Sequence, residues 1–419
     1  MATPQKIIHG TWAQAWAPLA VVSLFGLGMA HVWEFPFAAA RHGGLAFVLA
    51  WLLCMAVLAL PLRLLEIMLG RRSRRAPVEG LAFLTREADA PRFWRASAWG
   101  SVLGAVVGLA GLALLSGWAA SFLGHRLVSP EVYTATYSGL SWPLGTGVVI
   151  ALAAALAWKG MQKLAPVYFA LLVVVGLSLA VGAALGSGSA GPVLISFNGT
   201  SLGAAGWLEA ARFALLSLGG GVGLLWLVGA YLPADRSVAS LAVPAVLLQI
   251  VLTLLAALAL SPVVQIASSL PGHSAVLDQL PAALTSQGLL AWLAFSALAL
   301  SGVAGLAVLA EVVQRFLGER GLGALPAFVL TFAVTALLAE GLWFASAISQ
   351  ADGLLNLLRA LVLLVLLGLS VFSGWTMKIS HARKELNLPS EALYNLWRVA
   401  VRLVCPLAIV LVLVGGCFL

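Results

Sequence analysis

Residues 217–223 read Ser-Leu-Gly-Gly-Gly-Val-Gly, in the middle of an apolar run that extends over 206–232. Glycine in a helix interior costs about 1 kcal/mol relative to alanine, so four glycines within five residues should unwind this run. A second apolar run, 14–40, contains Gly26-Leu27-Gly28 near its middle and Pro36 beyond it. We therefore expect two helices that are each interrupted halfway along their length.

The composition places these runs in a membrane. Of the 419 residues, 62% are hydrophobic and only 9% are charged, and the mean hydropathy is +1.05. A soluble domain carries roughly 25% charged residues, whereas about 20 apolar residues in a helix cross a bilayer. We expect eleven membrane helices, over 14–40, 44–70, 97–125, 143–158, 164–186, 206–232, 237–265, 288–317, 323–347, 354–377 and 396–418.

Basic residues orient the expected helices, because connections rich in Lys and Arg face the cytoplasm. The basic groups lie in alternate connections: Arg71, Arg72, Arg74, Arg75, Arg86, Arg92 and Arg95; Lys159 with Lys163; Arg315 with Arg320; and Lys378 with Arg383 and Lys384. We predict a multi-pass protein of a bacterial-type inner (plasma) membrane, with the N-terminus cytoplasmic and the C-terminus outside. Segments 187–205 and 268–287 are expected as outer connections. The net charge of +8 then reflects orientation and predicts no nucleic-acid partner.

The sequence contains no pattern typical of an enzyme. The three cysteines, Cys54, Cys405 and Cys417, lie within apolar runs and lack metal-ligand spacing, so we expect buried small side chains. Nothing resembles a nucleophile triad, a phosphate-binding loop or a metal cluster. We expect neither covalent chemistry nor a bound metal or cofactor.

The two interruptions predict a ligand site. Unpaired backbone groups are tolerated at membrane depth only where they line a cavity or are buried in protein. Interrupted helices at corresponding positions of two halves indicate an inverted repeat with a site near the middle of the membrane. The alternative is that these glycines only allow close helix packing.

Several motifs, in order along the chain, resemble those of the sodium:neurotransmitter symporter family. They are Trp12; Gly26-Leu27-Gly28 through Glu34-Phe35-Pro36; Gly43 to Phe47; Pro61, Glu66 and Gly70-Arg71; Lys159-Gly160-Met161-Gln162 with Pro166; Trp207, Ser217 and Tyr231; and Trp375 through Asn387. The resemblance implies the LeuT fold, an all-α membrane bundle of two inverted five-helix repeats plus an eleventh helix, with helices one and six unwound at mid-membrane. A single transport domain, 1–419, would comprise a first repeat 1–186, a second repeat 206–377 and helix eleven, 396–418.

The resemblance also implies where a substrate binds. The positive end of a half-helix suits a carboxylate, and the implied contacts are the amides of Gly28, Met29 and Ala30 for the carboxylate, with Ser217, Gly219, Gly220 and Gly221 around the ammonium group. The family's tyrosine on helix three is Leu112 here, and Gly108 and Gly111 should enlarge that wall. Either backbone groups alone hold the carboxylate, or the ligand is not an ordinary amino acid.

The family's sodium ligands are only partly retained. Two asparagines of the first site become His31 and Leu248, and two hydroxyls of the second become Ala304 and Gly305. The remaining candidates are Leu24, Gly26, Leu27, His31, Ser217 and Ser301. Imidazole is a poor match for sodium, so the sequence argues against conventional two-sodium coupling, and Leu252 at the chloride position predicts no chloride site. His31 either titrates and replaces a sodium charge or stays neutral, bonded to a carbonyl.

Charged residues predict two gates. At the outer gate the family's arginine is Glu34, and Arg212 or Arg359 is the expected partner, with Glu209 as the alternative partner of Arg212. At the inner gate we expect Trp12, Tyr231, His9 and Glu319, the last two either as a pH-sensitive pair or as solvated loop charges. Glu66 is expected to support the unwound segment, with Arg63 as its neighbour.

The resemblance thus implies an alternating-access symporter for an amino acid or a similar solute, sodium-coupled in the family. A proton-coupled or ion-independent carrier is one alternative. A sensor, or a membrane subunit that docks a partner without transporting, is another. The substrate, the coupling ion and the oligomeric state stay open at this point.

Overall fold

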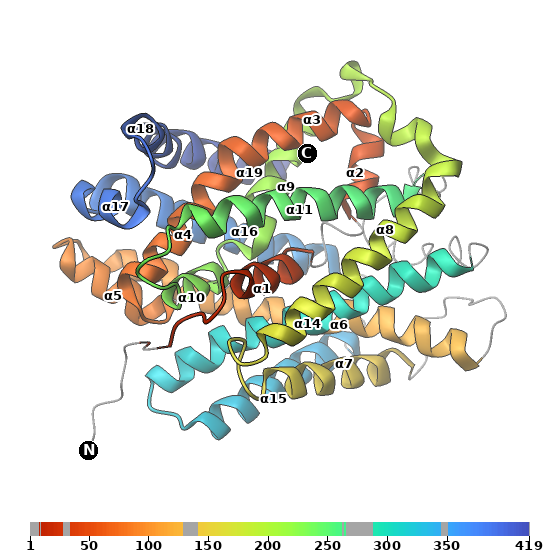
Figure 1. Cartoon of the computed structure of the whole chain (residues 1–419), viewed down its shortest axis with the longest axis horizontal. Coiled ribbons are helices and arrows are strands. Elements are labelled where there is room, and N and C mark those ends of the chain that lie inside the picture. Colours follow the sequence, from red (N-terminus) through yellow and green to blue (C-terminus); the bar gives the residue numbers. More distant parts are fainter. Residues whose placement is uncertain are drawn as a thin grey trace.

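The computed structural model describes residues 8, 10–27, 34–128, 141–261, 264, 288–344 and 351–418, which form a bundle of helices (Figure 1). The α-helices are α1 (Trp16–Gly26), α2 (Phe35–Arg41), α3 (Leu45–Cys54), α4 (Leu60–Ser73), α5 (Pro77–Glu87), α6 (Ala96–Val128), α7 (Ser141–Ala157), α8 (Ala165–Ile195), α9 (Gly203–Leu215), α10 (Leu224–Ala230), α11 (Ala239–Ala259), α14 (Leu289–Glu319), α15 (Ala324–Phe344), α16 (Ala351–Val371), α17 (Ile379–Leu386), α18 (Glu391–Val399) and α19 (Cys405–Phe418). Short π-helical turns, η2 (Met55–Ala59), η7 (Phe372–Thr376) and η8 (Ala400–Val404), interrupt or end longer helices, and the 3₁₀ turns are η3 (Arg92–Arg95), η4 (Gly199–Ser201) and η5 (Ser217–Gly219).

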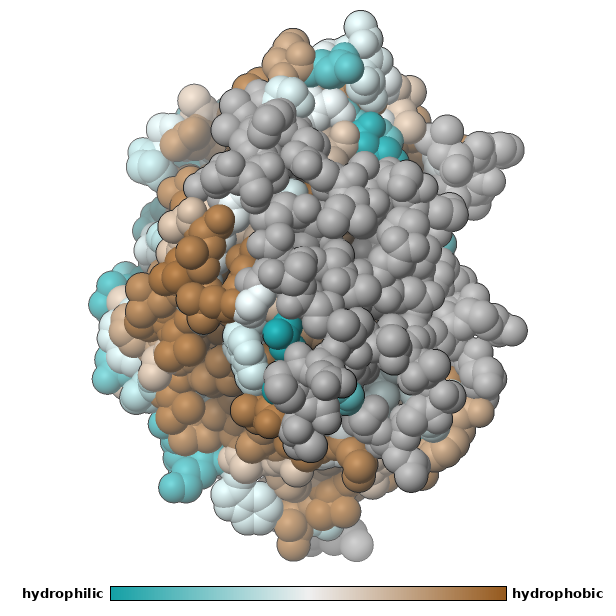
Figure 2. Space-filling model, turned by 90° about the vertical axis from the view of Figure 1, so that its right-hand side faces the viewer, coloured by the Kyte–Doolittle hydropathy of each residue, from teal (hydrophilic) through white to brown (hydrophobic). Residues whose placement is uncertain are grey.

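Eight helices of the described part are long and apolar enough to cross a membrane. The other three expected spans are the shorter α7 and the two interrupted helices, α1 with α2 and α9 with α10. The protein is therefore a multi-pass membrane protein. Apolar side chains line the flank of the bundle on the face shown in Figure 2, and Leu177 of α8 and Leu337 of α15 are 60% and 74% exposed, as expected for side chains that face lipid.

Several predicted boundaries were wrong. Helix α8 continues to Ile195, into the segment that we expected to be an outer loop. Its small residues permit close packing on α11, since a Cβ on Gly186 would lie 2.6 Å from the carbonyl oxygen of Leu258. Two short helices, α5 and α17, were not predicted, and the last span begins at Glu391 rather than at 396. The predicted outer connection 268–287 lies outside the described residues.

Helix α14 forms the centre of the bundle. In its most apolar window 83% of the residues are buried, the largest share among the eight long helices. It packs against α6, α7 and α8, and α1 and α10 also contact it. Two ends of the bundle serve as reference below: the α5 end, where α5 and α17 lie, and the opposite α2 end (Figure 1).

An ion-pair cluster joins three helices at the α5 end. Arg72, at the end of α4, bonds Glu87 of α5 through Nε at 2.9 Å and Nη2 at 2.5 Å, and it lies 3.4 Å from Glu385 of α17. Partial burial raises the pKa of the Glu87 carboxyl, but the hydrogen bond and charge of Arg72, with two further basic neighbours, outweigh this effect and hold the pKa below its usual range. The ionised form of Glu87 therefore stabilises this corner.

Candidate functional site

The sixth expected helix is interrupted where the glycines predicted it. Helix α9 ends at Leu215 and α10 begins at Leu224, so we call residues 216–223 the break. Within the break Leu218, Gly219, Gly221 and Gly223 have φ values of 53°, 66°, 81° and 80°. Glycine adopts this left-handed region without penalty, whereas Leu218 does so at a cost. The first expected helix likewise stops, since α1 ends at Gly26 and α2 begins at Phe35.

Two buried charges on α4 bond the free backbone groups of the break. Arg63 donates through Nη1 to Glu66 at 2.8 Å and through Nη2 to the carbonyl of Leu215, at the last turn of α9. The second carboxylate oxygen of Glu66 accepts the N–H of Gly221 at 3.0 Å. Both side chains are buried, with 0% and 1% exposure. An acceptor and a donor that would otherwise be unpaired in a membrane interior are thus satisfied by one ion pair.

This ion pair narrows the set of backbone groups that a ligand can use. A Cβ on Gly220 would lie 1.4 Å from Nη1 of Arg63, so the guanidinium packs directly on that residue. The Gly221 N–H is already bonded by Glu66. Within the described part of the chain, Arg63 and Glu66 form no hydrogen bond with Ser217 or Gly219, two other residues predicted to surround a substrate. The substrate role of all of these residues stays a prediction.

Apolar side chains occupy the space beside the break. The ring of Phe25 lies against Gly219, where a Cβ would come within 2.0 Å of it. Phe25 and Leu112 both face Gly305 of α14, at 3.5 and 3.7 Å from an added Cβ. Gly108 was expected to enlarge this wall, but Leu309 lies 3.3 Å from its Cβ position and fills that room. The wall beside the break is therefore apolar, as the sequence indicated, but less spacious.

Two buried side-chain oxygens near the end of α1 have no hydrogen-bond partner among the described residues: Ser23 Oγ and Gln249 Oε1. Gln249 donates its amide to Thr253 at 3.0 Å, and its Oε1 would lie 2.1 Å from a Cβ on Gly26. Oxygen atoms of this kind suit a hard cation. Sequence reasoning missed both residues, although Gln249 was visible as a polar residue in an apolar helix. Ser301, predicted as an ion ligand, uses its hydroxyl to bond the Leu298 carbonyl at 3.1 Å.

A cluster of four charges, with Glu34 buried and the other three partly buried, lies between the break and the α2 end. Glu34 contacts both arginines that the sequence offered as partners, Arg212 at 3.4 Å and Arg359 at a shorter distance. Arg212 also bonds Glu209 through Nε at 2.8 Å, so the two expected arrangements coexist. Side-chain exposure is 5% for Glu34, 14% for Arg212 and 13% for Arg359. This outer charge cluster closes the bundle one turn away from the break.

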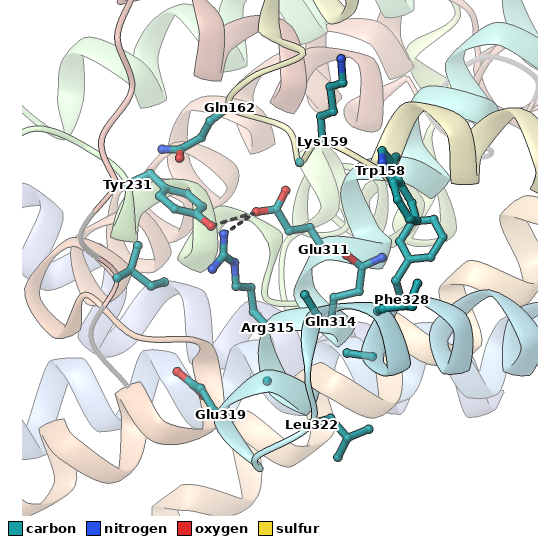
Figure 3. A pocket seen from close by; sticks show the side chains of 18 residues that line it. Trp158, Lys159, Gln162, Tyr231, Glu311, Gln314, Arg315, Glu319, Leu322 and Phe328 are labelled. Atoms are coloured by element: carbon teal, nitrogen blue, oxygen red, sulfur yellow. Dashed lines mark hydrogen bonds and ion pairs between the residues drawn. The ribbon is translucent and has the colours of Figure 1, made fainter. Parts of the chain in front are cut away.

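A second set of contacts closes the bundle between the break and the α5 end. Trp12 donates from its indole to the Val228 carbonyl and from its backbone to the Tyr231 carbonyl, each at 3.1 Å. The Tyr231 hydroxyl donates to Glu311 of α14 at 2.8 Å (Figure 3). Arg315 donates to the same carboxylate oxygen at 3.3 Å, and the other oxygen of Glu311 accepts the Met161 N–H at 2.8 Å. We call Trp12, Tyr231 and Glu311 with these partners the inner closure.

The inner closure contains an acidic residue that was not predicted, since Glu311 bonds Tyr231. Glu319, expected as the acidic partner of His9, accepts the Ala76 N–H at 2.9 Å at the start of α5. Glu311 was overlooked, although a carboxylate inside an apolar helix is a recognisable signal. His9, His31 and the amide-bearing residues Gly28, Met29 and Ala30 lie outside the described residues, so the contacts predicted for them stay predictions.

A cavity of about 750 Å³ lies beside the inner closure. Its lining comes from the ends of α7, α10 and α14, the start of α15 and the connection before α8, and it includes Tyr231, Glu311 and Arg315 (Figure 3).

Comparison with known proteins agrees with this architecture. Residues 10–129 match the family model described as the sodium:neurotransmitter symporter family. An uncharacterized sodium-dependent transporter YhdH of Bacillus subtilis is 26% identical over 57% of this chain and 56% of its own length. An uncharacterized sodium-dependent transporter of Haemophilus influenzae is 28% identical over 27% of this chain. The chain thus aligns with about half of the first relative and 25% of the second.

Shorter and structural matches extend the comparison. The sodium-dependent neutral amino acid transporter B(0)AT2 of Rattus norvegicus is 37% identical over 54 residues, 13% of this chain and 7% of its own. The crystal structure of MhsT in complex with L-phenylalanine superposes with a TM-score of 0.81 at 20% identity, and the match covers 97% of this chain and 100% of that one. At this identity the superposition shows that the two chains share a fold.

Proposed function

We propose that the chain is a member of the sodium:neurotransmitter symporter family, whose model matches residues 10–129, and that it is a secondary-active transporter of an amino acid or a similar solute. It shares its fold with MhsT. The observation that carries this proposal is the break in the sixth helix, which lies between two separate closures. The outer charge cluster closes one side and the inner closure the other. A site that is closed on both sides has the geometry of the occluded intermediate of alternating access.

Each closure is made of contacts that can separate. On the α2 side, Glu34 belongs to the start of α2, and its partners lie on α9 and α16. On the α5 side, Tyr231 follows α10 and bonds α14. Opening one side needs the loss of a few polar contacts, while the break stays supported by Arg63 and Glu66. Exchange between the two open states would carry a ligand across the membrane.

We propose a substrate with a carboxylate, an ammonium group and an apolar side chain. The amides of Gly28, Met29 and Ala30 would hold the carboxylate at a half-helix start, and Ser217 and Gly219 would meet the ammonium. Phe25 and Leu112 form an apolar wall beside the break, against which the apolar side chain of the substrate would pack. L-phenylalanine, with which MhsT forms a complex, and the neutral amino acids in the name of the rat transporter belong to this class.

We propose sodium as the coupling ion, held by a reduced set of ligands. Two similar bacterial proteins are named sodium-dependent. Gln249 Oε1, beside Gly26, supplies an oxygen that Leu248 lacks, and Ser217 adds a hydroxyl to the first site. The second site does not fit sodium, because Phe25 packs on Gly305, where the family has a hydroxyl. Leu252 is buried and apolar, which favours no chloride at that position.

The basic residues and the positive-inside rule support a cytoplasmic α5 end in a bacterial-type inner membrane. Seven arginines between 71 and 95, and the basic residues of α17, gather at this end. The inner closure and its cavity would then face the cytoplasm.

Uptake into proteoliposomes tests the function and the ion together. We expect L-phenylalanine to accumulate when sodium is outside and to stay at background when choline replaces it. If uptake is insensitive to sodium but driven by a pH gradient, the coupling ion is a proton rather than sodium, and His31 is the candidate residue that carries it. Thermal stabilisation by L-phenylalanine without any uptake would contradict transport and favour the sensor.

A further inference from the structure

The cavity beside the inner closure has the dimensions of a small-molecule site. Its volume of about 750 Å³ lies within the roughly 300–1,000 Å³ typical of ligand pockets. Its lining residues include none of Phe25, Leu112 and Ser217, which belong to the proposed substrate site. It is therefore separate from the substrate site proposed above.

The cavity has one polar and one apolar side. Figure 3 shows Gln162, Tyr231 and Arg315 on one side, with Trp158 and Phe328 together on the other. The rings of Trp158 and Phe328 meet edge to face with their centroids 5.1 Å apart. Two leucines, Leu322 and Leu325, also line the cavity.

The polar side offers more donors than acceptors. Glu311 already receives hydrogen bonds from Tyr231 and Met161, so little of its accepting capacity is left for a ligand. The Arg315 side chain is 48% exposed, and its bond to Glu311 is long, at 3.3 Å. The amide nitrogens of Gln162 and Gln314 have no hydrogen-bond partner in the described part of the chain. A carboxylate would satisfy such a set, while Glu319 carries the negative charge that would meet an ammonium group.

We propose that this cavity binds a second molecule of the transported class, an amino acid with a large apolar side chain. Its carboxylate lies toward Arg315 and its side chain against Trp158 and Phe328. Tyr231 lines the cavity and bonds Glu311, so the occupant stabilises the inner closure and opposes opening on this side. The ligand class rests on the proposed function, and the effect is feedback by solute on the cytoplasmic side.

Gly318 provides a selective test. It lines the cavity, and a Cβ there would meet nothing within 4 Å. Gly318→Trp should therefore fill the cavity without disturbing the helix, and Gly318→Ala is the matched control with the cavity open. In equilibrium binding of radiolabelled L-phenylalanine to the purified full chain, we expect two molecules per chain for the unmodified protein and Gly318→Ala, and one for Gly318→Trp. Phenylalaninamide, which lacks the carboxylate, should fail to compete at the site that Gly318→Trp removes.

The outcomes separate this inference from the proposed function. The single molecule that still binds to Gly318→Trp also shows that this variant is folded. One molecule per chain in the unmodified protein, or two in Gly318→Trp, would overturn the second site. Uptake is a separate measurement on the same preparations: if Gly318→Trp removes a bound molecule but no variant transports, the second site stands and the transport proposal fails.

Discussion

The Arg63–Glu66 pair makes the sharpest prediction, because both partners are buried and both bond the break. Arg63→Met removes the cation and leaves the Glu66 carboxylate and the Leu215 carbonyl without it. Removing one partner of a buried ion pair costs about 3–5 kcal/mol, since the remaining charge is uncompensated. Glu66→Gln should cost a similar amount, because it leaves the guanidinium unpaired and weakens the acceptor of the Gly221 N–H.

The double variant and an exposed pair are the controls. Arg63→Met with Glu66→Gln leaves no isolated charge, so its loss of stability should be clearly smaller than the sum of the two single losses. Arg383 and Glu391 form an ion pair with 57% and 76% side-chain exposure, and Arg383→Ala should cost at most about 1 kcal/mol.

These differences are measured by thermal unfolding of the purified protein. The fraction that stays monodisperse after heating to each temperature gives an apparent melting temperature for each variant. We expect both single variants to melt well below Arg383→Ala, and the double variant to recover part of the loss. The reasoning would be refuted if either single variant had the same melting temperature as Arg383→Ala, or if the loss in the double variant equalled the sum of the two single losses.

Three further changes follow from the same contacts. Gly220→Ala should destabilise the protein strongly in the same heating assay, because its Cβ would lie 1.4 Å from Arg63, whereas Gly147→Ala, with nothing within 4 Å, should be tolerated; equal melting would contradict the packing. Glu34→Gln should leave two partly buried arginines without their shared carboxylate, so that their mutual repulsion favours opening on the α2 side. This should be seen as faster labelling of a cysteine placed at Ser217; unchanged labelling would argue against a gate. The pKa of Glu87 is lowered in the folded protein, so its contribution is present above its unfolded pKa and is lost as pH falls through the folded value. Unmodified protein should therefore lose more stability than Glu87→Gln between about pH 5 and pH 3, and parallel losses would show that the Arg72 contact contributes nothing.

Much of the fold was predictable because its causes are local in the sequence. Long apolar runs specify membrane helices wherever they occur, and the run at 217–223 unwinds because four glycines lie together. The break and most of the helical spans followed from these patterns. The end of α8 did not, since the helix continues to Ile195 beyond its close contact with α11 at Gly186, and that contact is a tertiary feature.

Contacts of the candidate site were predictable only where the charge of one residue required a partner of opposite charge. Glu34 stands where the family has an arginine, so a basic partner was expected. The sequence offered Arg212 and Arg359 without showing that both would bind Glu34. Glu66 was expected to support the break. That Glu311 meets Tyr231 depends on how α14 packs beside α10, which no local pattern specifies.

The sequence by itself determined that the helices lie in a membrane, where most of them begin and end, and that the sixth is interrupted. It did so because hydrophobicity and glycine content act through neighbouring residues. Tertiary structure alone decided which groups the interruption uses: Arg63 reaches the carbonyl of Leu215 across 152 positions of sequence, and Phe25 fills the space at Gly219. Contacts of this kind arise from the approach of distant helices, and the free energy of packing and ion pairing between them selects one arrangement from the many that the same residues would permit.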